Sequence, residues 1–131
     1  MKKYLLFLAL AFVVVSCQKS IEERAAEEAE EYTTKLCPTP VVNYAQTDSL
    51  VFDKNTRTFI TYNTLVDKLD NQMVISTNKT EIEKVFLDNV RNSTELKAYK
   101  DADFNFRFVG RSGSNPKTIL YDYTFEPEDY Q

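Results

Sequence analysis

Residues 103–125, DFNFRFVGRSGSNPKTILYDYTF, decide the fold class of this chain. Polar and apolar residues alternate through 103–109, and the alternation returns through 118–125. Side chains of a β-strand point to opposite faces in turn, so a period of two predicts a strand with one buried face. The glycine- and serine-containing segment 110–117 is typical of a loop. The residues that share a face are Phe104, Phe106 and Phe108 in the first strand and Ile119, Tyr121, Tyr123 and Phe125 in the second.

A second hairpin is predicted nearer the N-terminus. Segments 50–52 and 59–65 are rich in β-branched and aromatic residues. Between them stands Asp53-Lys54-Asn55-Thr56, a run of turn-forming residues. Segment 66–77 is ambiguous, and its apolar part, 73–75, reads either as a short strand or as a buried crossing.

Two helices are predicted, each opened by a capping box of the pattern Ser/Thr-x-x-Glu. The first box is Ser20 to Glu23 and the second is Thr80 to Glu83. In such a box the hydroxyl and the carboxylate each satisfy a free backbone N–H of the first turn. Apolar residues follow both boxes at helical spacing. Proline cannot continue a helix, so the first should end before Pro38.

These elements predict an α+β domain spanning residues 17–131, with two helices packed on a four-stranded antiparallel sheet. The order helix, hairpin, helix, hairpin also suggests a duplicated unit, 20–66 and 78–126. At a constant offset, Tyr32 matches Phe86 and Leu50 matches Phe104. Two unrelated amphipathic units would give similar matches, so both readings stay open.

Composition argues against most kinds of catalysis. The chain has no histidine, which excludes Ser-His and Cys-His pairs and histidine-ligated metals. Its only two glycines lie in one loop, which excludes a glycine-rich phosphate cradle. We therefore predict a protein that is not an enzyme and needs no cofactor or metal. The 20 acidic residues outnumber 16 basic ones, which argues against binding nucleic acid.

The N-terminus carries a targeting signal. Lys2 and Lys3 precede the apolar run 4–15, which is too short to span a bilayer and has the length of a secretory core. The stretch Val14-Val15-Ser16-Cys17 that follows resembles the lipobox of bacterial lipoproteins. The resemblance implies that residues 1–16 are a signal peptide, removed before Cys17, and that Cys17 carries the lipid that anchors the chain to a membrane. Two or more acyl chains hold a protein stably, whereas one holds it marginally.

The residue after the cysteine bears on the location. Gln18 stands where lipoproteins of the Gram-negative inner membrane often have aspartate, so the resemblance implies the outer membrane, facing the periplasm or the cell surface. The mature domain, residues 17–131, is similar in outline to small lipoproteins of Gram-negative envelopes. An acidic domain gains little from anionic lipid, so the anchor should be the only membrane contact.

The best candidate for a binding surface is a set of tyrosines on the two hairpins: Tyr62, Tyr121 and Tyr123. Tyrosine on a sheet can offer aromatic contact area and a hydroxyl to a partner. The same residues are also ordinary strand formers that pack in cores. Three further tyrosines are candidates for surface aromatics: Tyr44, Tyr99 and Tyr130.

The remaining polar candidates favour structural roles. Cys37 is predicted to be a buried thiol, with an intermolecular disulfide as the alternative. The six glutamates of the first helix are more typical of a solvated face than of a cation site. The same holds for the strand-end carboxylates Asp101, Asp103 and Asp122, because nothing in the sequence indicates a cleft around them.

Three functional hypotheses follow. The preferred one is a lipid-anchored, non-catalytic module that binds an envelope protein. The second is a periplasmic inhibitor or immunity protein that covers a basic enzyme, since opposite charge speeds association. The third is a protein that binds glycans or peptidoglycan fragments through tyrosine faces.

Overall fold

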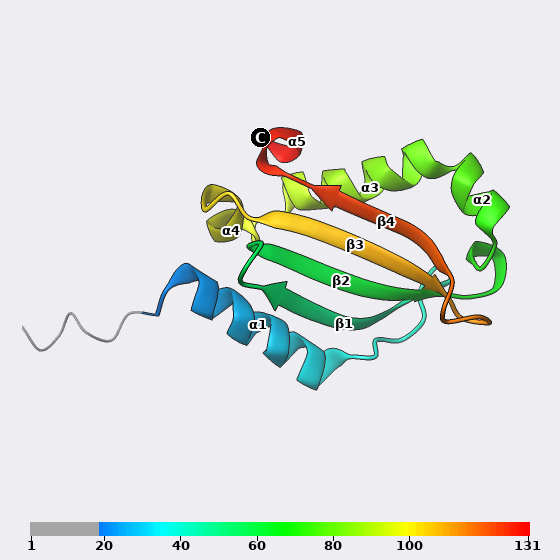
Figure 1. The fold of residues 1–131 in the computed structure, drawn as a ribbon, viewed down its shortest axis with the longest axis horizontal. Helices are drawn as coiled ribbons and strands as arrows, with labels where there is room; N and C mark the ends of the chain where they lie inside the picture. The colour runs from blue at the N-terminus through cyan, green and yellow to red at the C-terminus, as the bar shows by residue number, and fades with distance from the viewer. Residues whose placement is uncertain (1–18) are drawn as a thin grey trace, which may run out of the picture.

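The first helix begins where its serine cap predicts. The computed structural model describes residues 19–131 (Figure 1), and α1 runs over Ile21–Leu36. The Ser20 hydroxyl accepts a hydrogen bond from the Glu23 N–H at 3.1 Å, which satisfies one free N–H of the first turn. The helix ends before Pro38, as expected.

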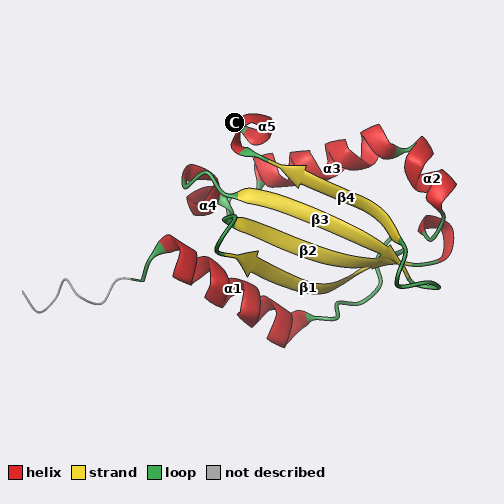
Figure 2. Ribbon diagram, in the orientation of Figure 1, coloured by secondary structure: helices red, strands yellow, loops and turns green. Residues whose placement is uncertain are grey.

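Four strands form one sheet in the order β1-β2-β3-β4 (Figure 2). Both predicted hairpins are present, because β1 pairs antiparallel with β2 and β3 pairs antiparallel with β4. In the first turn the Asn55 N–H donates to the Asp53 carboxylate at 2.9 Å. The strands are β1 (Ala45–Asp53), β2 (Thr58–Leu65), β3 (Asn105–Ser112) and β4 (Ile119–Phe125).

The sheet is mixed, so the prediction of a purely antiparallel sheet was wrong. The two hairpins meet through a parallel pair, β2 and β3, with Thr58 opposite Asn105 and Leu65 opposite Ser112. Parallel neighbours need a crossover rather than a tight turn. The segment between them, 66–104, is long enough to return the chain to the end of the sheet at which β2 begins.

That crossover is mostly helical, which corrects the predicted number of helices. Residues 19–131 hold five α-helices and one 3₁₀ helix, instead of two helices. Four of the six lie in the crossover and one follows β4. They are η1 (Asp67–Leu69), α2 (Gln72–Thr77), α3 (Lys79–Asn92), α4 (Lys97–Asp101) and α5 (Pro127–Tyr130).

A local cap explains why α2 is helical. The Asn71 side chain accepts hydrogen bonds from the N–H groups of Met73 and Val74, at 2.9 and 3.2 Å. This cap starts a helix in a segment whose apolar residues also suit a strand. The expected capping role of Thr80 was wrong, because α3 begins at Lys79 and places Thr80 inside its first turn.

The sheet has a helix-bearing face and an opposite face. Residues that pair across strands share a face, and one row on the helix-bearing side is entirely aromatic: Phe52, Phe59, Phe106 and Phe125. The next row along the strands lies on the opposite face: Val51, Ile60, Arg107 and Thr124. All five α-helices contribute side chains to the two core clusters of the helix-bearing side.

The helices of the two halves lie beside different strands. α1 packs along β1, the first strand of its pair (Figure 1). α3 lies beside β4, the second strand of its pair, and its Phe86 ring is 5.4 Å from the ring of Tyr121. The duplication of 20–66 and 78–126 therefore stays a prediction from the sequence.

Candidate protein-docking groove

A groove of about 320 Å³ opens on the helix-bearing face, between α1 and the segment that joins α3 to α4. Its floor comes from three neighbouring strands: Thr47, Leu50, Phe59, Thr61, Phe106 and Phe108. Leu50, Thr61 and Phe108 pair across the sheet and are half-buried. Phe59 and Phe106 form another row on the same face and are buried against Tyr99 of α4 and Tyr130 of α5. The half-buried row therefore leaves part of an apolar floor open, and covering it would be favourable.

One wall is α1, which is held close to the sheet. Its Ala25 and Ala29 are fully buried, and their small side chains let the helix approach the core. The Thr33 hydroxyl accepts from the Leu50 N–H at 2.9 Å and donates to the Leu50 carbonyl at 2.8 Å. Edge strands expose unpaired backbone groups, so this double bond both satisfies β1 and fixes α1 beside the groove.

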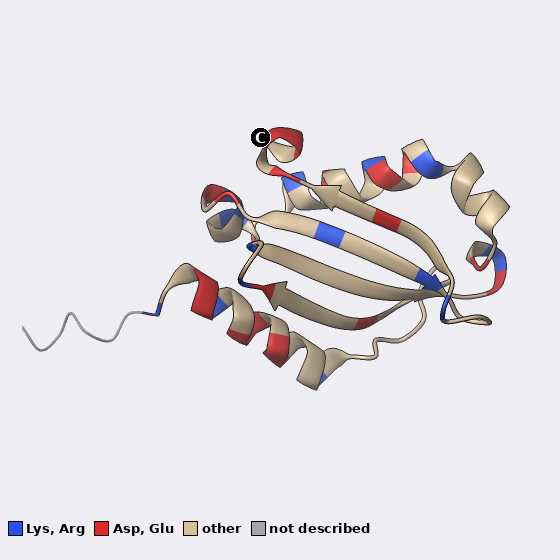
Figure 3. Ribbon diagram, in the orientation of Figure 1, with Lys and Arg blue, Asp and Glu red and all other residues tan. Residues whose placement is uncertain are grey.

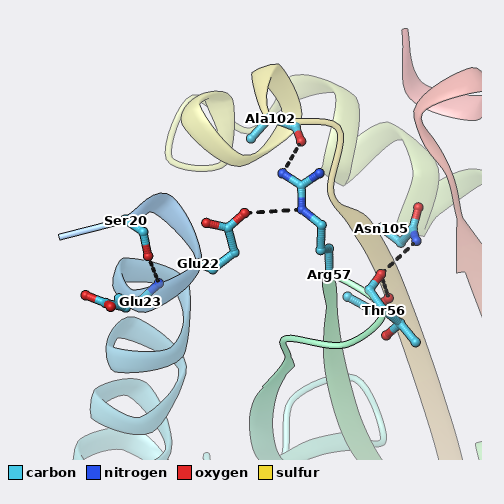
Figure 4. Close-up of polar contacts among 8 residues, drawn as sticks. Ser20, Glu22, Glu23, Thr56, Arg57, Ala102 and Asn105 are labelled. Atoms are coloured by element: carbon cyan, nitrogen blue, oxygen red, sulfur yellow. Dashed lines mark hydrogen bonds and ion pairs between the residues drawn. The ribbon is translucent and has the colours of Figure 1, made fainter.

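Arg57 ties the two walls together at one end (Figure 4). Its guanidinium lies 3.4 Å from the Glu22 carboxylate of α1 and donates to the Ala102 carbonyl, just after α4, at 2.9 Å. It also lies over the Phe104 ring, 4.8 Å from the centroid, where a cation is attracted to the aromatic face. Arg57 therefore links α1 to the segment that follows α4.

The rim carries negative charge. Glu28 and Tyr32 are one turn apart on α1, so both side chains lie on the groove side of the helix. Across the groove stand Glu95 and Leu96, just before α4. Acidic residues recur along α1 (Figure 3). The groove thus combines an apolar floor with carboxylates on both walls.

Tyr99 of α4 lies at the inner wall, and it is only 2% exposed. Its ring contacts Phe59 edge-on at 4.9 Å and stacks on Phe104 at 5.7 Å. Its hydroxyl is buried and makes no hydrogen bond of normal geometry. Burial, together with the neighbouring Glu28 carboxylate, raises the pKa of Tyr99. The sequence had suggested a surface aromatic here, and that expectation was wrong, as it was for the buried Tyr130.

The structure separates the three tyrosines predicted to form a binding surface. Tyr62 pairs with Val109 and Ser49 on the opposite face of the sheet. Tyr121 and Tyr123 are on the helix-bearing face, only 6% and 8% exposed, and lie near Phe86 of α3. Tyr62 is thus not brought together with the other two, which belong to the core.

The structure describes only one of the two cysteines. Cys17 and the signal peptide lie outside the described residues. Cys37 is a free, half-buried thiol. Burial is the first cause that raises its pKa, and Asp48 is the second. A raised pKa keeps the sulfur in its less reactive thiol form.

The carboxylates that were weighed as a metal site have other partners. Arg107 forms a two-bond pair with Asp122, at 2.8 and 2.6 Å. This pair lowers the pKa of Asp122 and raises that of Arg107. Asp101 accepts from Lys97 at 2.8 Å. Within residues 19–131, His, Cys, Asp and Glu nowhere gather in a group of three that could hold a metal ion. In the same part of the chain, every helix is too short or too polar to cross a membrane.

Comparison with known families places the chain. Residues 20–121, which include both walls and the floor of the groove, match the model of a family described as Domain of unknown function (DUF8479). The chain belongs to this family. A comparison of the DUF8479 chain with curated protein sequences found no match.

Solved structures share the DUF8479 fold at low sequence identity. A protein from Pseudomonas aeruginosa described as secreted is 8% identical, with a TM-score of 0.67, and the match covers 87% of this chain and 100% of that one. The pilotin EpsS of the Vibrio vulnificus type 2 secretion system is 10% identical, with a TM-score of 0.62 and coverage of 84% and 91%. The type II secretion system pilotin AspS from Vibrio cholerae is 11% identical, with a TM-score of 0.58 and coverage of 82% and 90%. At these identities the likeness shows a common fold.

Proposed function

We propose that this chain is a lipid-anchored, non-catalytic protein of the bacterial outer membrane that binds another envelope protein. The observation that carries the proposal is the open groove with an apolar floor and acidic walls. The occupant we propose is an amphipathic helix of the partner, with an apolar stripe against the floor and basic residues at the rim.

The shape and charge of the groove support this occupant. The floor has the width of three strands between α1 and the segment that joins α3 to α4, and at about 320 Å³ the groove admits a row of side chains. Amphipathic helices bind such grooves through apolar residues at positions i, i+3, i+4 and i+7. Glu28 and Glu95 favour a partner with positive charge, because complementary charge speeds encounter and selects partners.

The membrane location rests on the N-terminal sequence and on the fold. The lipobox-like run that ends at Cys17 supports lipidation and export. Two of the solved structures with this fold are pilotins of secretion systems, which agrees with a partner in the envelope. Metabolic labelling with a radioactive fatty acid tests the anchor. The wild-type chain should be labelled and found in the outer membrane. The Cys17→Ser variant should carry no label and should not be found in the outer membrane.

Site-specific crosslinking tests the groove in living cells. We would place a photoreactive benzoylphenylalanine at Tyr32, on the groove rim, or at Tyr44, which lies outside the groove. Position 44 is a matched control for position 32, because the two tyrosines are 39% and 36% exposed. The proposal predicts one protein crosslinked through position 32 and not through position 44, and the crosslinked peptide should be an amphipathic segment with basic residues.

Three outcomes contradict the proposal. They are equal crosslinking from both positions, crosslinking from position 44 alone, and no crosslink at position 32 when the chain is abundant and folded. If the partner captured at position 32 is an enzyme that loses activity on binding, the role is inhibition rather than assembly.

A further inference from the structure

We infer that the groove selects a lysine or arginine side chain of the docked helix, held by Glu28, Glu95 and the hydroxyl of Tyr99. The inference rests on the proposed docking function and specifies which chemistry the partner must present. It starts from an unbonded polar atom at the inner wall of the groove.

The Tyr99 hydroxyl is that atom. Tyr99 is 2% exposed and lines the groove, and its hydroxyl makes no hydrogen bond of normal geometry among residues 19–131, although the Glu28 carboxylate lies near it. Buried polar groups are nearly always bonded, so an exception in a native fold calls for an explanation. The ring is fixed between Phe59 and Phe104. The phenol oxygen therefore has a fixed position, from which it can donate toward the nearby Glu28 carboxylate and accept from a basic group that enters the groove.

The charges around this hydroxyl favour a cation. Glu28 lies close enough to raise the pKa of Tyr99, and Glu95 stands on the other wall. Glu28 has a long contact with Arg24, at 3.9 Å, between two exposed side chains, and it lies beside the Tyr99 hydroxyl. Glu95 makes no ion pair within residues 19–131. Both carboxylates are thus free to accept hydrogen bonds from a basic side chain, whereas an acidic one would be repelled.

The rest of the groove suits a basic residue on a peptide better than a free cation. Lysine and arginine carry apolar stems that pack on apolar surface while the charged end stays near polar groups. Leu50 and Leu96 offer that surface, and the Tyr32 ring offers an aromatic face to the charge. The ammonium or guanidinium donates to the two carboxylates and to the phenol oxygen.

Peptide binding to the full lipidated chain in detergent tests the inference. The probes are fluorescent helical peptides of about four turns, with a leucine stripe and one lysine placed in turn at each position beside that stripe. Each has a twin with glutamine in place of lysine, and binding is followed by anisotropy. One lysine peptide should bind about tenfold more tightly than its twin, as one charge-assisted hydrogen bond would give, and rising salt should reduce the preference.

Variants locate the selection. Glu28→Gln and Glu95→Gln should each reduce the preference for lysine, and Tyr99→Phe should reduce it without unfolding the chain. Glu31→Gln is the matched control, because it makes the same change on α1 away from the groove and should keep the preference. If Glu31→Gln reduced the preference for lysine as much as Glu28→Gln does, the preference would be a general effect of net charge. That result would overturn the inference.

The remaining outcomes separate this inference from the docking proposal. Thr61→Lys should block the floor and weaken both peptides. If lysine and glutamine peptides bind equally and both are weakened by Thr61→Lys, docking stands and the basic selection is wrong. If no peptide of the set binds, or Thr61→Lys changes nothing, the docking groove fails and the selection fails with it.

Discussion

Tyr99 shows how much of the groove depends on a single side chain. Leu96 and Tyr99 are three positions apart, and in a helix such spacing places both on one face, so the sequence held a signal that the prediction of a surface aromatic missed. Which way that face turns depends on where α4 sits on the sheet. That position is set partly by Arg57, which sequence patterns do not connect to α4. The hydroxyl is buried as a consequence of packing and not of any local pattern.

Replacing Tyr99 by phenylalanine should therefore leave stability unchanged or increase it, by up to about 1 kcal/mol, because the change removes a buried hydroxyl that makes no hydrogen bond of normal geometry. Urea unfolding of the lipidated chain measures this. Tyr130→Phe is the control, because it removes a 2.8 Å bond to the Phe104 carbonyl and should cost about 1 kcal/mol. Equal losses for the two variants would contradict the unbonded state of Tyr99.

Tyr121 contributes to the alkaline side of the stability curve, together with Tyr99, Tyr123 and Tyr130, whose pKa values burial also raises. Burial raises the pKa of Tyr121 from 10.0 to about 12, although the bond from Asn63 opposes the rise. A phenol whose pKa is raised on folding contributes stability fully below the unfolded value, and that contribution is lost as pH rises. The free energy of unfolding should thus fall between pH 10 and 12, by as much as about 2–3 kcal/mol for this group.

Urea unfolding below pH 10 and between pH 10 and 12 tests this, with phenolate absorbance as a second readout. Tyr121→Phe should reduce the fall, and Tyr44→Phe, which removes an exposed hydroxyl, should leave it as in the wild type. A fall unchanged in Tyr121→Phe would contradict the assignment.

At the scale of elements, α1 serves both as a wall of the groove and as a cover for the β1 edge. Both functions pass through Thr33, whose hydroxyl bonds the backbone of Leu50 in both directions. An edge strand without such a cover can pair with another chain. The same contact sets the distance between α1 and the groove floor.

Thr33→Val keeps the shape of the side chain and removes both hydrogen bonds. The free energy of unfolding should fall by about 1–3 kcal/mol, because two backbone groups of Leu50 lose their partner. Thr34→Val is the matched control, an exposed threonine on the same helix, and should change stability by less than about 0.5 kcal/mol. Urea unfolding compares the two variants, and similar losses in both would mean that Thr33 has no special role.

The elements also show where prediction from sequence stops. The alternation in β3 and β4 identified both strands, because a period of two leaves few alternatives. It misplaced Ile119, since the pairing shifts between Gly110 and Arg111 and leaves Ile119 51% exposed while Leu120 is buried. The parallel pairing of β2 and β3 was not predictable in this way. It depends on the helical crossover, in which the Asn71 cap was the overlooked signal.

At the scale of the whole molecule, the two faces of the sheet differ in chemistry. The opposite face carries ion pairs between strands: Arg107 of β3 with Asp122 of the neighbouring β4, and Arg111 of β3 with Asp48 of β1, across β2. The helix-bearing face carries the aromatic core and the open groove. A chain with a net charge of −4 and an apolar groove at its centre is suited to a basic, amphipathic partner. The central claim is therefore that binding occurs on one face only.

The most direct test is the affinity of the lipidated chain for the segment captured by crosslinking, compared between Thr61→Lys and Thr124→Lys. The two variants make the same substitution on opposite faces of the sheet, since Thr61 pairs with Phe108 and Thr124 pairs with Arg107. Thr61→Lys should weaken binding by at least about tenfold, because it fills the groove and adds a charge that repels a basic helix, and Thr124→Lys should bind as the wild type does. Equal affinities for the two variants, or a loss in Thr124→Lys alone, would contradict the docking groove.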